Sequence, residues 1–172
     1  MNFRTPHHIL RWLFIPKQSF LEEFELDFIV LPLDIDFNLH LNNAKYLGFM
    51  DLGRMDATIR SGLFKAALKH KWQAVAASVN IVFRKEIPPF ARFKLKTRLI
   101  SFDEKWFYVE QDFVHKGKLC AKAIVKVGLL KGKLIEPNIV LEKMGLENVN
   151  LEMPHYLKEL IQGEKDFILT TK

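Results

Sequence analysis

The stretch that decides the fold is ARFKLKTRLISFDEKWFYVEQDFVHKGKLCAKAIVKVGLL, residues 91–130. Its first segment alternates regularly: one side carries Phe93, Leu95, Thr97 and Leu99, and the residues between them are basic. Side chains along a β-strand point to opposite faces in turn, so this alternation predicts a strand with one buried face. The segments SFDEK and HKGK interrupt the apolar runs and predict two hairpin turns. The stretch therefore predicts three antiparallel strands, the last of which includes Ala123, Val125 and Val127 facing inward.

The residues on either side of this stretch extend the sheet and add helices. Residues 73–85, QAVAASVNIVFRK, are largely apolar and predict a fourth strand, so we expect a four-strand meander from 73 to 130. FELDFIVLPL, residues 24–33, predicts an earlier strand, and a broad apolar face from Tyr46 to Gly62 predicts a long buried helix. Shorter helices are expected at LFKAALKHK, LEKMGL and PHYLKELI. This order predicts an α+β fold in which an antiparallel sheet wraps around one long central helix.

Length and composition restrict the class of protein. A chain of 172 residues with 49% hydrophobic residues and 15 phenylalanines is long enough for one domain with a substantial core. The formal charge of +6 favours anionic partners such as acidic lipids, nucleic acids or phosphate-bearing small molecules. The single cysteine, Cys120, rules out an internal disulfide bond and is typical of a reducing compartment, so we expect a cytoplasmic protein. No run approaches the roughly 18 apolar residues of a membrane-spanning helix.

The N-terminus, MNFRTPHHILRWLFIPKQSF, contains three basic residues and no acidic ones. Arg11 interrupts its apolar stretch and no small-residue cleavage site follows, which argues against a signal peptide. Two interpretations stay open. Residues 1–20 form either a short helix that packs against the domain or a basic amphipathic segment that contacts a membrane surface. The packing residues of that helix would be Ile9, Leu10, Leu13 and Phe14. We divide the chain into this N-terminal segment, a main domain and a helical tail, at residues 1–22, 23–136 and 137–172.

A polar cluster, DIDFNLHLNNAKY at residues 34–46, lies between the first strand and the long helix. Asn42 directly precedes the helical pattern and is a favourable N-cap. The amides at a helix start carry a partial positive charge that suits a developing oxyanion, and the Asp36 carboxylate lies a few residues upstream. Donors and a carboxylate together are the minimum for attack on an acyl group. The alternative is a purely structural turn, in which each polar residue only orders the loop.

Other catalytic chemistries find little support in the sequence. No GxSxG motif indicates a serine hydrolase, and Cys120 lies within a strand pattern that suits the core better than a nucleophile. Asp36 and His40 are four residues apart, but no further cluster of liganding residues accompanies them, so we expect neither a metal site nor a cofactor.

The pattern Asp34-x-Asp36-x-x-x-His40-x-Asn42-Asn43-x-x-Tyr46 resembles the D-x-D-x-x-x-H-x-N-N-x-x-Y signature of hotdog-fold acyl-CoA thioesterases. The resemblance is to the 4-hydroxybenzoyl-CoA thioesterase-like branch and covers roughly residues 24–131. It extends through LGFMDLGRMD, FRKEIPPFARFKLKTRL and DEKWFYVEQDFV. It implies a hotdog fold, hydrolysis of an acyl-CoA or acyl-carrier-protein thioester in lipid metabolism, and a homodimer or homotetramer with active sites at the subunit interface.

The resemblance also assigns roles to individual residues. It implies that Asp36 is the catalytic carboxylate, as general base or nucleophile, and that the backbone N–H at Asn43 polarises the thioester carbonyl. His40 and Asn42 would organise the site, and Asp34 would order the turn. Tyr46 would line the acyl pocket or simply pack in the core.

Two further positions bear on the resemblance. Many family members have glycine immediately before the motif histidine, where this chain has Leu39, which either alters the loop or plugs an acyl pocket. Asp51 falls near a position where many members have an acid. It is either a second functional carboxylate or an i, i+3 partner of Arg54.

Basic residues are concentrated at 84–98 and 116–133. They either hold the phosphates of CoA or form the solvated outer face of the sheet. Their alternation with apolar residues, and the lack of a recognisable reader motif, argue against nucleic-acid binding. The rival function is a non-catalytic protein that binds acyl-CoA or lipid and keeps only the hotdog shell.

Overall fold

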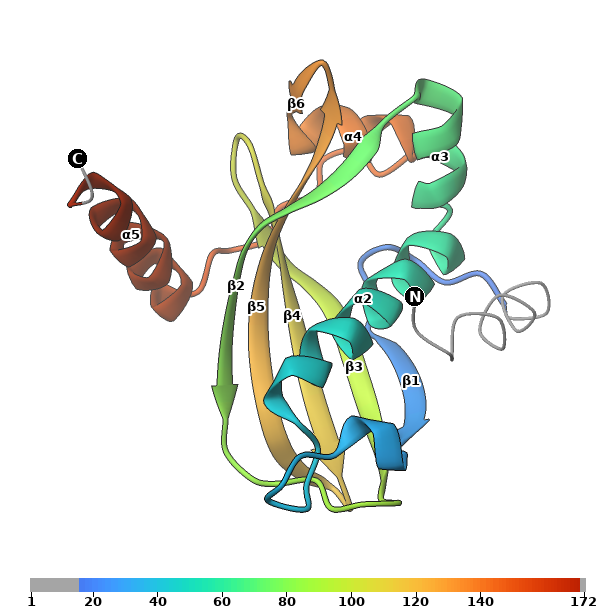
Figure 1. Cartoon of the computed structure of the whole chain (residues 1–172). Helices are drawn as coiled ribbons and strands as arrows, with labels where there is room; N and C mark the ends of the chain where they lie inside the picture. The colour runs from blue at the N-terminus through green and yellow to red at the C-terminus, as the bar shows by residue number, and fades with distance from the viewer. Residues whose placement is uncertain (1–15, 171–172) are drawn as a thin grey trace.

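An antiparallel sheet curves around one long helix in the computed structural model, which describes residues 16–170 (Figure 1). The strands are β1 (Phe24–Ile29), β2 (Gln73–Phe83), β3 (Arg92–Phe102), β4 (Phe107–His115), β5 (Lys118–Lys131) and β6 (Lys133–Ile135). The helices are η1 (Pro32–Asp34), α2 (Asn43–Arg60), α3 (Leu63–His70), α4 (Pro137–Lys143) and α5 (His155–Leu169). The predicted α+β architecture is confirmed. The helix that would pack Ile9, Leu10, Leu13 and Phe14, one of the two interpretations of the N-terminus, lies outside the described residues.

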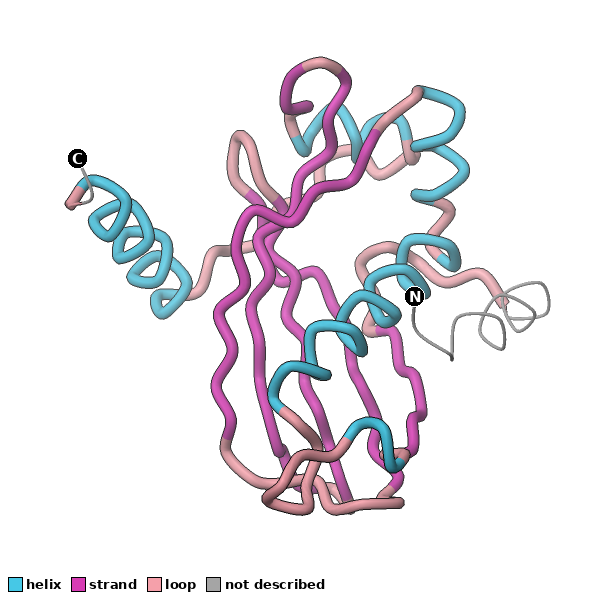
Figure 2. The backbone as a smooth tube through the Cα atoms, viewed as in Figure 1, coloured by secondary structure: helices cyan, strands magenta, loops and turns pink. Residues whose placement is uncertain are grey.

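The order of the strands corrects one prediction. The strands follow one another as β1-β3-β4-β5-β2, and β6 pairs with β5. The β3-β4-β5 hairpins are as expected, but the four-strand meander is wrong, because β2 pairs with β5, placing Val79 opposite Val125. The physical reason is the connection at residues 84–91. It is too long for a tight hairpin turn and carries the chain across the end of the sheet to β3 (Figure 2).

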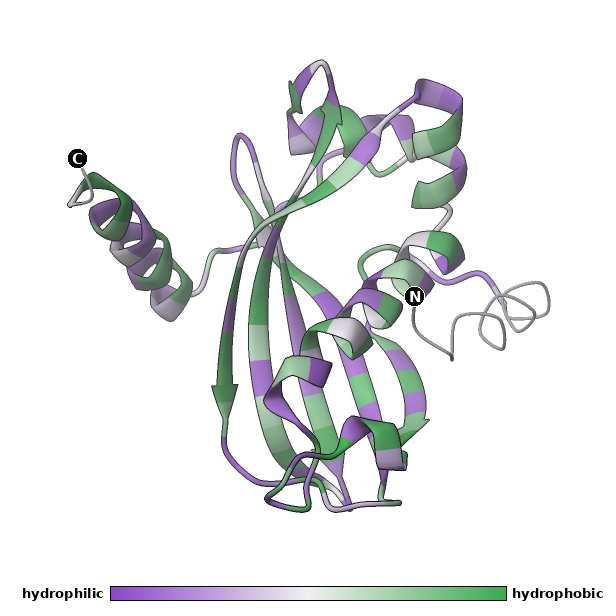
Figure 3. Cartoon of the chain, viewed as in Figure 1, coloured by the Kyte–Doolittle hydropathy of each residue, from purple (hydrophilic) through white to green (hydrophobic). Residues whose placement is uncertain are grey.

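Alternation along the strands decides which face is buried. On β3, every second residue from Phe93 onward is buried, and Figure 3 shows the resulting bands of hydrophilic and hydrophobic residues on β1 and β3. The buried face packs against α2 through aromatic rings. The ring centroids of Phe49 and Phe28 are 4.9 Å apart, and those of Phe49 and Phe93 are 5.1 Å apart. Edge-to-face pairs at this spacing stabilise a core by about 0.5–1.5 kcal/mol each beyond their buried area.

Gly53 lets α2 approach the sheet closely. A Cβ atom at this position would lie 2.7 Å from both Leu95 Cδ2 and Thr97 Oγ1. Beneath it, the fully buried amide of Gln111 donates to Met50 O at 3.0 Å and to Thr97 Oγ1 at 2.9 Å. The helix is therefore held by a close backbone approach and by a buried polar network.

The ends of several elements differ from their predicted positions. Strand β1 ends at Ile29 rather than residue 33, because Pro32 begins the short helix η1. Helix α4 begins at Pro137, since proline suits the first helical position, and it ends at Lys143, before Gly145 adopts a positive φ of 74°. The last helix is longer than predicted, and β6 was missed altogether.

Helix α5 packs against the outer face of the sheet. Leu157 is fully buried in a cluster with Tyr108 and Ile124. At the start of α5 the Tyr156 hydroxyl donates to Glu110 Oε2 on β4 at 3.1 Å, and near its end Glu164 accepts from Ser78 on β2. The helix thus crosses the sheet from β4 to the edge strand. Among residues 16–170, no helix is long and apolar enough to span a membrane.

Candidate active site

The loop between β1 and α2 closes into a tight turn that brings Asp36 and His40 together. The Asp36 N–H donates to His40 O at 3.2 Å, and the Leu39 N–H donates to Asp36 O at 3.1 Å. A bridge between Ile35 and Leu41 closes the base of the turn. The two polar side chains that the sequence singled out therefore leave the backbone side by side.

Leu39 occupies the tip of this turn in a left-handed conformation, with φ of 57°. Glycine adopts that conformation without steric cost, whereas a leucine there is strained. The Leu39 side chain is 68% exposed in the single chain, and its role as a plug of an acyl pocket stays a prediction.

The Asp36 carboxylate is held by one oxygen. Its Oδ1 atom accepts from the Asn38 N–H at 2.9 Å and lies 3.7 Å from His40 Nδ1. That second distance is too long for a direct hydrogen bond, although it is short enough for charge attraction when the imidazole is protonated. Oδ2 accepts no hydrogen bond from a described residue, and the side chain is 22% exposed. One carboxylate oxygen is thus oriented and the other is available.

Asp34 has a structural position. Its side chain is buried, and Oδ2 accepts from the Leu31 N–H at 2.8 Å. Its main-chain oxygen accepts from the Asn42 N–H, also at 2.8 Å. These bonds tie the end of the first strand to the residue that begins α2, which is the ordering role expected for Asp34.

The start of α2 presents an unused donor. Asn42 is the N-cap, and its Oδ1 atom accepts from the Ala44 N–H at 2.9 Å, while its main-chain oxygen accepts from the Lys45 N–H. The backbone N–H of Asn43 donates to no residue within the described part of the chain. Since the first amides of a helix lack partners within the helix, this group is available to a carbonyl oxygen.

A pocket of about 270 Å³ opens beside this helix start. It brings together three of the predicted site residues, His40, Asn43 and Tyr46, while Asp36 lies beside His40 without lining the pocket. The remaining lining residues are Leu41, Phe83, Arg84, Lys85 and Glu86.

Tyr46 both packs and lines the pocket. Its ring centroid lies 4.9 Å from that of Phe83 and 4.6 Å from that of Phe113. Burial raises the pKa of the Tyr46 phenol to about 12, with a smaller contribution from Cys120. The phenol therefore stays protonated at neutral pH and does not act as a general base there.

Residues 83–86 were missed as part of the site. Phe83 is the last residue of the edge strand β2, and residues 84–86 follow it. They reach α2 only through the fold, so no local motif links them to Asn43. Their composition, an arginine, a lysine and a glutamate between a strand and two prolines, was the available signal. Glu86 places a carboxylate on the wall of the pocket itself, whereas Asp36 lies beside His40 without lining it.

Asp51 lies away from the pocket. It is eight residues beyond Asn43 on α2, or about 12 Å along the helix axis at 1.5 Å per residue. Its carboxylate is mostly exposed and forms an ion pair with Arg54. The geometry is that of the i, i+3 pair considered as the alternative role. Burial lowers the pKa of the Arg54 guanidinium, and Asp51 opposes this shift.

Neither metal nor thiol chemistry gains support at this site. Within residues 16–170, no group of three or more His, Cys, Asp or Glu side chains is arranged to hold a metal ion. Cys120 is buried in the main core, as predicted, and burial raises the pKa of its thiol. A thiol with a raised pKa is a poor nucleophile at neutral pH.

Comparison with known proteins agrees with this architecture. The family profile described as "Thioesterase-like superfamily" matches residues 30–138. Protein THEM6 of Danio rerio is 33% identical over 150 residues, which cover 83% of this chain and 73% of that protein. A probable thioesterase of Saccharomyces cerevisiae is 35% identical over 129 residues, which cover 72% of this chain and 55% of that protein.

Solved structures show the same fold at lower sequence identity. YbaW, a probable thioesterase from Escherichia coli, gives a TM-score of 0.66 at 21% identity, over 71% of this chain and 96% of that one. The hypothetical protein SAV2348 from Staphylococcus aureus, solved in complex with CoA, gives a TM-score of 0.62 at 14% identity, over 83% of this chain and 94% of that one. The chain with its sheet wrapped around α2 therefore belongs to the thioesterase-like superfamily, and it is a hotdog-fold hydrolase that acts on thioesters.

Proposed function

We propose that this protein hydrolyses acyl-CoA or acyl-carrier-protein thioesters, with Asp36 as the catalytic carboxylate and the Asn43 N–H as the donor to the thioester carbonyl. The observation that carries the proposal is the Asn43 N–H at the start of α2, which donates to none of the described residues. It lies on the wall of a pocket that His40 also lines. A preorganised donor stabilises the charge that develops on the carbonyl oxygen, and the protein need not reorganise during the reaction.

Asp36 supplies the second half of the chemistry in this proposal. As a general base it would take a proton from the attacking water, and as a nucleophile its free Oδ2 would attack the carbonyl carbon and form an anhydride that water then cleaves. In both routes the thiolate of the substrate leaves and the acyl group departs as a carboxylate. His40, 3.7 Å from Asp36, and the N-cap Asn42 would position these groups.

We further propose that two or more copies of the chain assemble through the free edge of β2. Among residues 16–170 this strand pairs with β5 on one side and with no strand on the other, and it exposes Val79, Val82 and Phe83. The neighbouring face of α2 exposes Leu47 and Met55. An exposed apolar edge strand is otherwise a site of aggregation, and Phe83 also lines the pocket, so a second copy would complete the pocket wall.

The test is a hydrolysis screen with short, medium, long and aromatic acyl-CoAs, on wild-type protein and on Asp36→Asn. The substitution keeps the shape of the side chain and removes its charge, so we expect kcat to fall by about 10²–10⁴-fold, the range for loss of a general base. The matched control is Asp27→Asn, which removes an exposed carboxylate on β1 and should leave kcat within twofold.

Light scattering on the same preparations should give at least twice the mass of one chain.

Wild-type turnover by Asp36→Asn would show that the carboxylate assignment is wrong. Tight binding of acyl-CoAs by the wild-type protein, without turnover of any of them, would contradict hydrolysis and favour a binding protein.

A further inference from the structure

Three loops meet at one end of the sheet, the lower end in Figure 1. Main-chain hydrogen bonds join two of them. The Phe90 N–H donates to Val30 O at 3.0 Å, and the Leu41 N–H donates to Ile87 O at 2.9 Å. The third loop is the β4–β5 turn, which His115 Nδ1 ties to Arg92 O at 2.7 Å. We call this part of the molecule the loop end, and it consists of residues 30–45, 84–92 and 115–118.

Large apolar side chains project from the loop end. Phe37 is 105% exposed, which is the accessibility of a side chain in an extended peptide, and Leu33 is 78% exposed. Three more large apolar side chains are exposed here, those of Leu31, Leu39 and Phe90. A single exposed leucine is ordinary on a protein surface, but several large apolar groups gathered at one end mark a site of interaction with a protein or a membrane.

The loop end is also basic. It contains three acids, Asp34, Asp36 and Glu86, of which Asp34 is buried. Its six exposed cations are those of Lys45, Arg84, Lys85, Arg92, Lys116 and Lys118. None of the six forms an ion pair with a carboxylate in the described part of the chain.

The lysines on the outer face of the sheet have different surroundings. Lys94 lies 2.6 Å from Glu25, and Lys96 lies 2.6 Å from Glu23. Acids from a neighbouring strand therefore neutralise that face, whereas the positive charge of the loop end is unbalanced.

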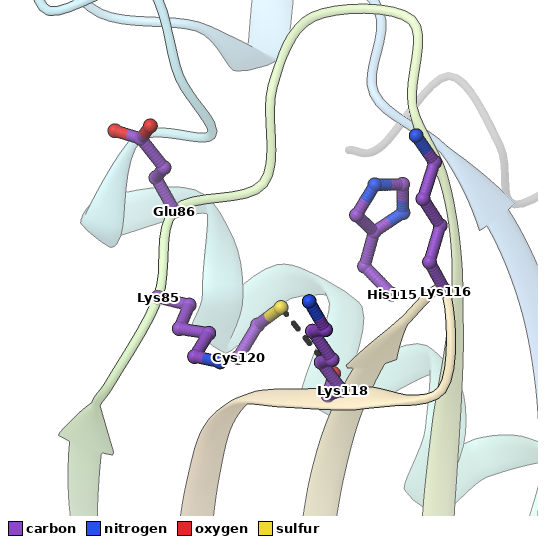
Figure 4. Close-up of a pocket in the computed structure, with 6 residues that line it drawn as sticks. All are labelled: Lys85, Glu86, His115, Lys116, Lys118 and Cys120. Atoms are coloured by element: carbon purple, nitrogen blue, oxygen red, sulfur yellow. Dashed lines mark hydrogen bonds between the residues drawn. The ribbon is translucent and has the colours of Figure 1, made fainter.

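Cations and apolar groups lie next to one another at the loop end. Figure 4 shows Lys85, Lys116 and Lys118 around an open hollow of about 540 Å³, with the Glu86 carboxylate pointing away from Lys118. An adjoining hollow of about 410 Å³ is lined by Lys116 and by the exposed ring of Phe90. The loop end thus offers projecting apolar side chains with ammonium groups beside them.

We propose that the loop end docks on the surface of a membrane that contains acidic lipids. Leu33, Phe37 and Phe90 would enter the boundary between head groups and acyl chains, and the six cations would contact the lipid head groups. Binding of this kind draws on buried apolar area together with attraction to anionic lipids, and long basic side chains reach the head groups while their stems stay among apolar neighbours. The proposal goes beyond thioester hydrolysis and does not depend on it, because docking is measured without turnover.

A second copy of the chain is a poorer occupant of the loop end. Its own loop end carries the same positive charge. At the other end of the sheet, α3 and the residue after it present further lysines, Lys65, Lys69 and Lys71. Like charges would therefore face each other whichever end of the second copy approached, and such juxtapositions oppose association. An acidic bilayer supplies negative charge and an apolar interior together.

The experiment is co-sedimentation of the full chain with vesicles of phosphatidylcholine, alone or mixed with phosphatidylserine. The variants at the loop end are Leu33→Ser/Phe37→Ser and Lys116→Ala/Lys118→Ala. The matched control is Phe64→Ser/Leu68→Ser, which removes two exposed apolar side chains from α3. Residues 1–22 are the same in every protein, so any contribution from them is common to all. Thermal unfolding of each variant verifies that it is folded.

We expect the wild type to bind the acidic vesicles at least about tenfold more tightly than the neutral ones, because each basic residue near an acidic surface contributes about fivefold. The lysine variant should weaken binding to the acidic vesicles about tenfold and reduce its dependence on salt. Leu33→Ser/Phe37→Ser should weaken it about tenfold or more, since burying one large apolar side chain is worth about this factor. The α3 control should stay within about twofold of the wild type, because its side chains would not enter the bilayer.

Tryptophan fluorescence tests insertion directly. Phe37→Trp should give emission that shifts to the blue on acidic vesicles and is quenched by brominated lipid. Phe64→Trp on α3 should give neither effect once the signal of the three native tryptophans is subtracted.

Four results would overturn the proposal. The first is a wild type that does not bind acidic vesicles, and the second is equal binding by the wild type and Leu33→Ser/Phe37→Ser. The third is loss of binding in the α3 control alone, which would place the membrane face on α3. The fourth is a smaller particle mass for Leu33→Ser/Phe37→Ser in light scattering with unchanged vesicle binding, which would assign these side chains to contact between copies.

Discussion

Replacing Gly53 with alanine is a direct test of how closely α2 lies against the sheet. The added Cβ atom would be 2.7 Å from Leu95 Cδ2 and Thr97 Oγ1, and 2.8 Å from Gln111 Nε2. Ordinary contacts between such atoms are about 3.5–4.0 Å, so the helix or its neighbours must move by about 1 Å. The atoms in the way belong to the buried layer that holds α2, and Gln111 is fully buried.

The expected cost follows from three contributions. Overpacking a core costs about 1–3 kcal/mol, and weakening the bonds that Gln111 donates to Met50 and Thr97 adds about 1 kcal/mol. The better helix propensity of alanine offsets about 1 kcal/mol of this cost. We therefore expect a net destabilisation of about 2 kcal/mol, which corresponds to a melting temperature lower by about 4–8 °C in a domain of this size.

Gly163→Ala is the matched control. Gly163 lies within α5, and a Cβ atom there would meet no atom within 4 Å. The same substitution should therefore keep the helix-propensity gain of up to about 1 kcal/mol and raise the melting temperature by about 2–4 °C. Scanning calorimetry of the two variants should show a lower melting temperature for Gly53→Ala and a higher one for Gly163→Ala. A Gly53→Ala protein as stable as Gly163→Ala would refute the close approach of α2 to β3 and β4.

Two other substitutions test features of the loop and of the outer face. Leu39→Gly should stabilise the fold by about 1 kcal/mol or less. The substitution relieves the roughly 1–2 kcal/mol that the left-handed conformation costs leucine, but glycine gives the unfolded chain more conformational entropy, which offsets part of that gain. A lower midpoint in urea would contradict this. Burial opposes ionisation of Glu110, but Lys122 and Arg98 outweigh it and lower the Glu110 pKa below the usual 4.5. These ion pairs therefore stabilise the fold above about pH 4.5, and the stabilisation is lost as the pH falls through the lowered pKa. Glu110→Gln should be less stable than wild type at pH 7, and the difference in unfolding free energy should shrink toward pH 3; a constant difference would rule the linkage out.

Strands and helices were predictable here wherever one face is buried and the other is not. Strand β3 and helix α2 carry their periodicity in the sequence, because alternating or helical spacing follows directly from the geometry of the backbone. The partner of β2 was not predictable in this way. Its apolar run shows that it is a strand, but only the length of the connection at residues 84–91 indicates that it does not pair with β3.

The candidate site likewise contains residues that the local sequence predicts and residues that only the tertiary structure brings in. Asp36, His40 and Asn43 lie within one short segment, so their proximity follows from a turn and a helix start. Arg84 and Glu86 join them through tertiary structure alone. The surface charge shows the same limit. Lys96 is neutralised by Glu23, more than seventy positions away in the chain. No local pattern distinguishes it from Lys116, which forms no ion pair within residues 16–170.

Helix α5 shows that the recognisable family segment and the stable folding unit have different boundaries. The family match ends at residue 138, yet Leu157 fills the hydrophobic surface formed by Tyr108 and Ile124. A chain trimmed to the matched region would leave those two side chains in water and Glu110 without its tyrosine partner. A change at Leu157 on the helix must therefore be matched by a change in the strand residues beneath it, as in any layer of the core.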